Sequence, residues 1–221
     1  MPRSRNLYEP DSEKPFRLSR SKVDSFLNCK RCFYLDRRMG ISQPPGFPFN
    51  LNSAVDQLLK SEFDHYREIS KPHPLMTEYG VDAVPFQHEN LETWRANFTG
   101  VTYVEPETNF SLFGAVDDLW QDNKTGEILV VDYKATSKNG EVTLDADWQI
   151  AYKRQMEFYQ WLLRQNGLKV SNTGYFVYCN GRRDLDKFEG RLEFRVKVIP
   201  YEGTDKWVRS TIKEIYKTLN Q

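Results

Sequence analysis

A predicted β-hairpin in the middle of the chain constrains its fold more than any other feature. Two apolar runs, Ala115–Trp120 and Ile128–Tyr133, flank the turn-forming sequence Asp122-Asn123-Lys124-Thr125-Gly126. Asp and Asn favour tight turns, and Gly best tolerates a positive φ at the end of one. The two runs are therefore predicted to form antiparallel strands that pair with each other.

Acidic side chains meet in this hairpin. If it is symmetric about its two central turn residues, Asp117 lies opposite Asp132, and a bulge at Gly126 would shift the pairing by one residue. Because side chains alternate between the faces of a strand, Lys134 lies on the same face as Asp132. Two carboxylates and a lysine are therefore predicted to converge.

These three side chains have two interpretations. A solvated face, on which the two acids are merely tolerated, is the weaker one, because like charges across a ladder are destabilising and the strands are otherwise apolar. A divalent cation would remove the repulsion. Carboxylate ligands without nearby His or Cys favour Mg²⁺ or Mn²⁺ over Zn²⁺. The lysine would then hold a water nucleophile or neutralise charge on an anionic transition state.

Three motifs follow one another in the chain: Gly114-Ala115-Val116-Asp117, Asp132-Tyr133-Lys134 and Gln155-Met156-Glu157-Phe158-Tyr159. Together they resemble the PD-(D/E)XK nuclease superfamily, and within it the RecB-like branch, which includes the CRISPR-adaptation nucleases. The resemblance implies a single α/β domain with a restriction-endonuclease-like αβββαβ core, in which helices flank a mixed central β-sheet. It covers roughly residues 18–179.

The resemblance also implies roles for individual residues. Asp117 and Asp132 would bind one or two Mg²⁺ or Mn²⁺ ions, with the main-chain carbonyl of Tyr133 as a candidate further ligand. Lys134 would orient the attacking water, which makes Asp117, Asp132 and Lys134 the candidate catalytic residues. In RecB-like nucleases a helix that comes before this hairpin in the chain often carries a histidine near the metal. Here Asp56 stands in that place and is a further candidate metal ligand.

The third motif lies on a predicted helix. Tyr152, Gln155 and Tyr159 are spaced i, i+3 and i+7 and share one helix face, with Trp148 one turn earlier. A core face would explain the aromatic residues but not the glutamine. We therefore expect this face to combine packing with nucleic-acid contact.

A local excess of basic residues lies near the N-terminus. The chain as a whole has 31 Lys and Arg against 31 Asp and Glu, so any nucleic-acid binding must be local. Residues 14–38 contain many more basic than acidic residues, and Lys30 and Arg31 are candidate phosphate contacts. A solvated helix face is an equally weighted alternative, and the resemblance to nucleases favours the phosphate contacts.

The cysteines suggest thiols rather than a metal or redox centre. Cys29 and Cys32 form a CxxC motif, but only Cys179 remains to complete a four-ligand site, and an odd count argues against a disulfide framework. We expect buried or half-buried thiols. Some RecB-like nucleases hold an iron–sulfur cluster with three further cysteines near the C-terminus. This chain lacks them, so no iron–sulfur cluster is expected.

Length and hydropathy predict one domain. Residues 1–17, which are polar and contain three prolines, are expected to form a flexible arm, and residues 18–221 the nuclease-like domain. The run Val104–Phe113 predicts one strand that leads into the hairpin. No apolar run suggests a signal peptide or membrane span, so an intracellular, cytoplasmic protein is expected.

Taken together, these features predict a metal-dependent nuclease that acts on DNA, with RNA as an open alternative, and by analogy with RecB-like relatives an exonuclease or flap-type enzyme in DNA repair. Such relatives often work beside helicases or integration machinery, so a partner of that kind is a candidate. The alternative function is a non-catalytic nucleic-acid-binding subunit that retains the fold. The replacement of the family histidine by Asp56 keeps that alternative open.

Overall fold

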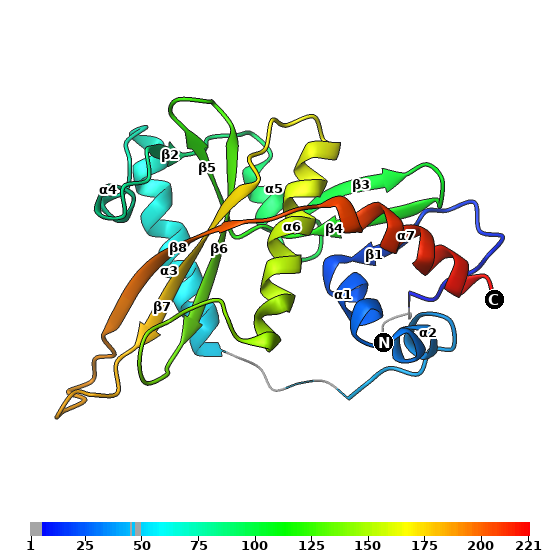
Figure 1. The fold of residues 1–221 in the computed structure, drawn as a ribbon, viewed down its shortest axis with the longest axis horizontal. Helices are drawn as coiled ribbons and strands as arrows, with labels where there is room; N and C mark the ends of the chain where they lie inside the picture. The colour runs from blue at the N-terminus through cyan, green and yellow to red at the C-terminus, as the bar shows by residue number, and fades with distance from the viewer. Residues whose placement is uncertain (1–5, 45, 47–49) are drawn as a thin grey trace.

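Two mixed β-sheets with helices on their faces build the domain in the computed structural model, which describes residues 6–44, 46 and 50–221 (Figure 1). The larger sheet has the order β2-β5-β6-β7-β8, in which β6 and β7 are parallel and the other neighbours antiparallel. Its strands are β2 (Ala83–Pro85), β5 (Asp118–Asp122), β6 (Ile128–Thr136), β7 (Thr173–Gly181) and β8 (Phe194–Glu202). The predicted mixed α/β domain is confirmed.

A second, smaller sheet lies beside the first. Its order is β1-β4-β3, with β1 parallel and β3 antiparallel to β4. Its strands are β1 (Phe16–Ser19), β3 (Val101–Glu105) and β4 (Phe110–Gly114).

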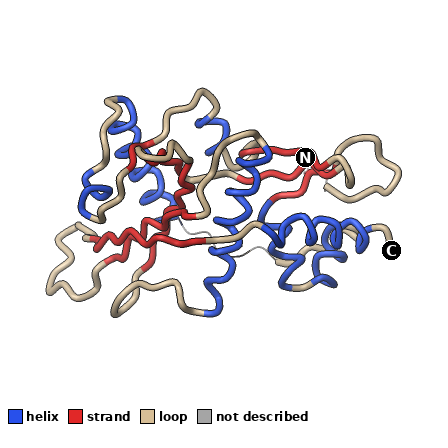
Figure 2. The backbone as a smooth tube through the Cα atoms, turned by 45° about the horizontal axis from the view of Figure 1, so that its top comes forward, coloured by secondary structure: helices blue, strands red, loops and turns tan. Residues whose placement is uncertain are grey.

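Eight helices surround the sheets in the described part of the chain. They are α1 (Arg20–Asn28), α2 (Lys30–Arg37), α3 (Asn50–Glu68), α4 (Pro74–Glu78), α5 (Leu91–Arg95), the 3₁₀ helix η1 (Asp147–Gln149), α6 (Ile150–Gln165) and α7 (Lys206–Leu219). Helices α1, α2 and α7 contact one another at the end of the molecule near the C-terminus (Figure 2). No helix in the described residues is long and apolar enough to cross a membrane.

Strand β6 lies between two apolar cores, which explains its nearly unbroken apolar sequence. Val130 packs into the core formed with α6, whereas Leu129, Val131 and Tyr133 pack into the core formed with α3. Because side chains alternate along a strand, Asp132 shares the α6 side with Val130. The sheet therefore turns this carboxylate towards α6.

The predicted register of the hairpin is confirmed. Asp118 pairs with Val131 and Trp120 with Leu129, so the ladder runs on towards Asp117 and Asp132. Gly126 adopts φ 68° at the end of the turn without shifting the pairing. The first predicted strand, Ala115–Trp120, is shifted along the chain, however, because β5 begins at Asp118 and runs on to Asp122.

The single strand predicted over Val104–Phe113 is wrong. The structure has two antiparallel strands here, β3 and β4, joined by a turn at residues 106–109. Pro106 has no N–H to donate to a ladder, and Asn109 adopts φ 55°, which asparagine tolerates better than most residues. These two residues turn the chain back on itself.

The described part of the N-terminal arm lies against the domain. Tyr8 is buried and packs edge-on against Phe16 and Phe110, with ring centroids 5.3 and 5.9 Å away. Strand β1 begins at Phe16, earlier than the predicted start at residue 18. The flexibility predicted for residues 1–5 concerns residues outside the described part of the chain.

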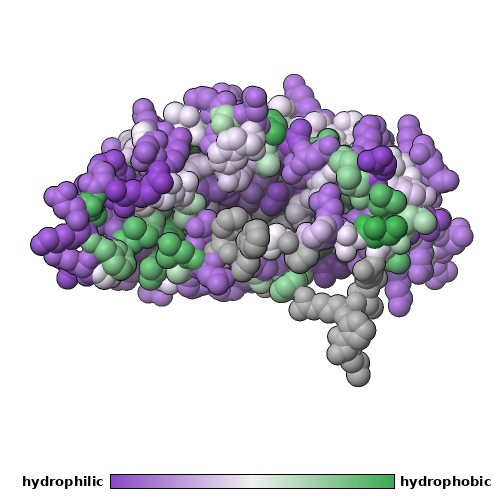
Figure 3. All heavy atoms as spheres, turned by 90° about the horizontal axis from the view of Figure 1, so that it is seen from below, coloured by the Kyte–Doolittle hydropathy of each residue, from purple (hydrophilic) through white to green (hydrophobic). Residues whose placement is uncertain are grey.

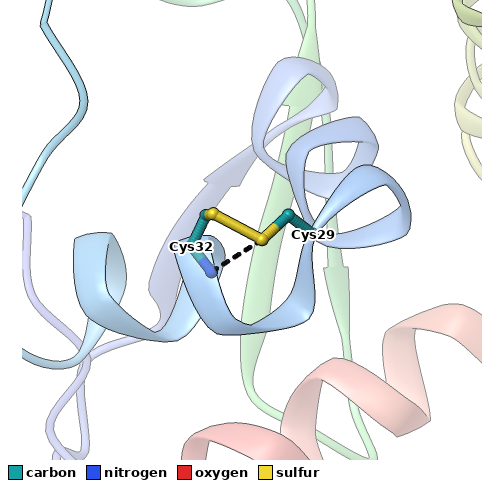
Figure 4. Close-up of a disulfide and its surroundings, with 2 residues drawn as sticks. All are labelled: Cys29 and Cys32. Atoms are coloured by element: carbon teal, nitrogen blue, oxygen red, sulfur yellow. Dashed lines mark hydrogen bonds between the residues drawn. A yellow bond between two sulfur atoms is a disulfide. The ribbon is translucent and has the colours of Figure 1, made fainter.

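Cys29 and Cys32 form a disulfide, which corrects the prediction that both are thiols (Figure 4). Cys29 caps the N-terminus of α2, and its sulfur accepts a hydrogen bond of 3.1 Å from the main-chain N–H of Cys32. This first turn brings the two Cα atoms to 5.3 Å, within the range for a disulfide. Cys179 is a buried free thiol, and burial, followed by the charge of Glu62, raises its pKa to about 11.

Candidate active site

Asp117 and Asp132 lie together at the start of the β5–β6 ladder. Asp117 Oδ2 accepts a hydrogen bond of 2.9 Å from the main-chain N–H of Tyr133, the residue that follows Asp132. Burial, and then the charge of Asp132, raise the pKa of Asp117 to about 6. The two carboxylates therefore repel each other, and their role as metal ligands remains a prediction.

Asp132 is completely buried and depends on two partners. Its Oδ1 accepts a hydrogen bond of 2.7 Å from Gln155 Nε2, and its Oδ2 pairs with the ammonium of Lys134. No other donor in the described part of the chain reaches Oδ2. A buried charge of this kind is tolerated only because its counter-charge lies beside it.

Lys134 is positively charged at neutral pH. Burial alone would lower its pKa, but the carboxylates of Asp132 and Asp117 outweigh burial and raise the pKa above its ordinary value. Its Nζ also lies 4.7 Å from the ring centre of Tyr152, a cation–π contact. Lys134 is therefore a hydrogen-bond donor and a charge rather than a proton acceptor at neutral pH.

The predicted face of α6 is present, and its residues differ in exposure. Gln155 Nε2 bridges Asp132 and the hydroxyl of Tyr159, at 2.7 and 3.3 Å. Tyr159 is 4% exposed, Tyr152 is half-buried and Trp148 is exposed, with its ring edge-on to Tyr152. Tyr159 and Gln155 thus hold the site together, Tyr152 is partly accessible beside them, and the exposed Trp148 lies on η1 rather than on α6.

Two of the three motifs touch each other through Gly114. A Cβ atom built on this residue would lie 2.5 Å from Cε1 of Tyr159, closer than any real contact. The glycine therefore lets the strand that leads to Asp117 pack on the ring of Tyr159.

Gly114→Ala is expected to lower the free energy of unfolding by about 1–3 kcal/mol, because the aromatic ring cannot move away without disturbing the core. Urea unfolding measures this. Gly181→Ala is the matched control, since its new Cβ would meet its nearest atoms at 3.6 Å. Equal effects of the two substitutions would contradict the contact.

A second lysine, Lys60 on α3, was not predicted from the sequence. Its Nζ lies 2.8 Å from Asp56 Oδ2 and 3.9 Å from Asp117 Oδ1. Burial and then the charge of Asp117 raise the pKa of Asp56. Asp56 thus lies close to the site, but its carboxylate is paired with Lys60, and its role as a metal ligand remains a prediction.

A buried charge network behind the site was also not predicted. Asp118 is completely buried and accepts hydrogen bonds from Arg95, at 2.7 Å, from the hydroxyl of Tyr133, at 2.7 Å, and from Arg67. Asp64 binds Arg95 from the other side at 2.8 Å. Asp117 and Asp118 therefore hold the same residue, Tyr133, by its main chain and by its side chain.

Lys30 and Arg31 are not brought to these carboxylates. The ammonium of Lys30 pairs with Glu214 on α7 and lies 5.6 Å from the ring centre of Phe26. Arg31 is exposed on α2. Within the described residues no contact joins either side chain to Asp117, Asp132 or Lys134. Their contact with nucleic acid remains a prediction.

The donor atoms fit a hard divalent cation. Asp117 and Asp132 supply carboxylate oxygens that repel each other without one. No cluster of three or more His, Cys, Asp or Glu side chains that could hold a metal occurs in the described residues. Mg²⁺ suits such a sparse set, because it is usually held by one or two carboxylates and completes its shell with water and substrate phosphate.

Comparison with known proteins agrees with this geometry. A family model of the PD-(D/E)XK nuclease superfamily matches residues 17–220. No curated protein matches the chain.

Proposed function

Because this chain belongs to the PD-(D/E)XK nuclease superfamily, we propose that it is a metal-dependent nuclease that hydrolyses phosphodiester bonds in DNA. The observation that carries this proposal is the buried ion pair of Asp132 and Lys134 next to Asp117. A chain that had lost catalysis would have no reason to retain this costly pair beside a second, repelling carboxylate.

Each residue of the site has a separate role in hydrolysis. Asp117 and Asp132 would hold Mg²⁺ or Mn²⁺, which as a Lewis acid polarises the scissile phosphate and lowers the pKa of water. Lys134 donates hydrogen bonds that place the attacking water, and its charge offsets the negative charge that develops on the phosphate. Gln155 fixes the orientation of Asp132 through the 2.7 Å hydrogen bond, and Asp117 is fixed by the N–H of Tyr133.

We place the chain in the RecB-like branch and assign it exonuclease or flap-type cleavage of single-stranded ends in DNA repair. The Gln155–Tyr159 motif supports the branch, because its glutamine contacts the buried aspartate directly. The half-buried ring of Tyr152 and the exposed ring of Trp148 suit unpaired bases. A helicase or integration-machinery partner would supply the ends.

End-labelled single-stranded, duplex and flapped DNA, together with single-stranded RNA, tests the proposal in Mg²⁺, Mn²⁺ and EDTA. We expect cleavage of DNA in either metal, no cleavage in EDTA, and no cleavage by Asp132→Asn. The product ladder then gives the polarity. If the wild-type protein binds DNA but cuts nothing in either metal, the chain is instead a non-catalytic binding subunit, the function that Asp56 in place of histidine favours.

A further inference from the structure

A lysine that belongs to none of the three motifs reaches the candidate active site. Lys60 lies on α3, and its Nζ is 2.8 Å from Asp56 Oδ2 and 3.9 Å from Asp117 Oδ1. Its side chain is only 16% exposed, so the ammonium lies between two carboxylates rather than in solvent. An ordinary i, i+4 ion pair on a helix surface involves no third side chain from a distant part of the chain. Lys60 is therefore part of the site.

Each carboxylate of the Asp117 and Asp132 pair has one oxygen fixed by a neutral donor and one oxygen that faces a lysine. Asp117 Oδ2 accepts a main-chain N–H, and Asp132 Oδ1 accepts a side-chain amide N–H. Asp117 Oδ1 lies near the ammonium of Lys60. Asp132 Oδ2 pairs with the ammonium of Lys134. Two cationic side chains thus already lie at the pair, one beside each carboxylate.

A second metal ion would need a further carboxylate beside Asp117. The ions of a two-metal site lie about 3.5–4 Å apart, and Mg²⁺ holds its ligands at about 2.0–2.1 Å. Asp56 is the candidate for that carboxylate, but the ammonium of Lys60 lies between it and Asp117. Across the part of the chain that the structure describes, no group of three His, Cys, Asp or Glu side chains could hold a metal. Lys60 therefore occupies the place that a second ion would need.

The charges at the site also favour one divalent cation. Three carboxylates and two ammonium groups meet here, those of Asp56, Asp117, Asp132, Lys60 and Lys134. Together they leave one net negative charge. One divalent cation and one phosphodiester bring the total to zero, whereas a second divalent cation would leave two positive charges uncompensated. Such an excess is costly where the charged groups are largely removed from water.

The site opens on the lower side of the domain, where α3 and α6 begin (Figure 1). A hollow of about 220 Å³ is lined there by Asp56, Lys134 and Tyr152. Figure 3 views this side and shows a mostly hydrophilic surface with a separate apolar area. Lys60 lies one turn of α3 further from the helix start than Asp56. A phosphate in the hollow therefore has one lysine on the β6 side and the other on the α3 side.

We propose that the ammonium of Lys60 takes the place of a second metal ion, so that the site holds one divalent cation, an inference that rests on the proposed nuclease function. Asp117 and Asp132 hold that cation. Asp56 acts on Lys60 rather than on metal, because its carboxylate fixes the ammonium beside Asp117. Lys60 supplies the positive charge that a second ion would otherwise supply at the phosphate.

Counting bound Mn²⁺ by electron paramagnetic resonance, in metal-free protein and without nucleic acid, tests the proposal. We expect the wild type to bind one Mn²⁺ per chain. Lys60→Ala frees Asp56 beside Asp117 and should bind two. Asp56→Asn/Lys60→Ala, which lacks the further carboxylate, should return to one. Lys22→Ala is the matched control, because Lys22 pairs with Asp36 outside the site, and it should bind one Mn²⁺ like the wild type.

The wild type gives a second test, which does not depend on whether Lys60→Ala folds. Below saturation, the rate of DNA cleavage should rise in direct proportion to the Mg²⁺ concentration, because one ion completes the site. A rate that rises with the square of that concentration would overturn the proposal.

Two results of the Mn²⁺ count would also overturn it: two bound ions in the wild type, or a single bound ion in Lys60→Ala that has kept its fold. A wild type that binds no Mn²⁺ contradicts both the single-cation site and the metal-dependent nuclease. A wild type that binds one Mn²⁺ but never cuts DNA would keep the single-cation site and lose the nuclease function. The two proposals can therefore fail separately.

Discussion

Lys134→Ala is expected to lower the single-turnover rate of DNA cleavage by about 10²–10³-fold. Lys134 is held protonated between two carboxylates, so its contribution is a fixed charge and a fixed set of donors at the reacting phosphate. Removing one such preorganised donor typically costs that much. Quenched-flow cleavage of end-labelled DNA at saturating enzyme measures the rate without a contribution from product release.

Two further variants make the Lys134 result interpretable. Lys134→Arg keeps a positive charge beside Asp132 and so protects the fold, but its planar, longer side chain misplaces the donors, so the rate should still fall. Lys169→Ala removes a lysine that is 69% exposed and lies next to Glu127, and should cleave at the wild-type rate. Cleavage by Lys134→Ala within a few-fold of the wild type would exclude Lys134 from catalysis.

Asp118→Asn is expected to lower the free energy of unfolding by about 3–5 kcal/mol, although its neighbour Asp117 should tolerate the same substitution. Asp118 is completely buried and accepts hydrogen bonds from Arg67 and Arg95. Its neutralisation leaves two buried arginines with Asp64 as the carboxylate that they share, so one buried positive charge loses its partner, which is the costly way to break a buried ion pair. Urea unfolding at pH 7 in EDTA measures the change.

Asp117→Asn should instead raise the free energy of unfolding at pH 7 without metal. The pKa of Asp117 is about 6 in the folded protein against an ordinary value of 3.8, so folding disfavours its ionised form. This cost is absent below pH 3.8, grows as the pH rises, and is complete above pH 6. The gain from the substitution should therefore be larger at pH 7 than at pH 5. A loss of stability for both neighbouring aspartates would contradict the different roles assigned to them.

The parts of the fold that follow from local sequence were predictable. The turn residues 122–126 determine the hairpin register, and the register places Asp117 and Asp132 together. The spacing of Tyr152, Gln155 and Tyr159 predicted the helix face that meets them. Each of these predictions needs only chain geometry over a few residues.

Contacts between distant segments were not predictable. Lys60 reaches Asp117 because α3 packs on β6, and the sequence contains only its i, i+4 spacing to Asp56 as a signal. The two arginines that bind Asp118 come from α3 and α5. The sequence of β5 around Asp118 does not indicate that its carboxylate will contact them. The odd number of cysteines was misleading because it excludes complete pairing but not one local disulfide.

Binding of a divalent cation by Asp117 and Asp132 is the central claim, and thermal unfolding in Mn²⁺ without nucleic acid tests it most directly. A cation that binds only the folded protein raises its melting temperature, by about 5–10 °C at roughly 100 times the dissociation constant for a chain of this size. We predict this rise for the wild type and none for Asp132→Asn, which lacks one of the two carboxylates. An unchanged melting temperature of the wild type across millimolar Mn²⁺ would contradict the claim, as would an equal rise in Asp132→Asn.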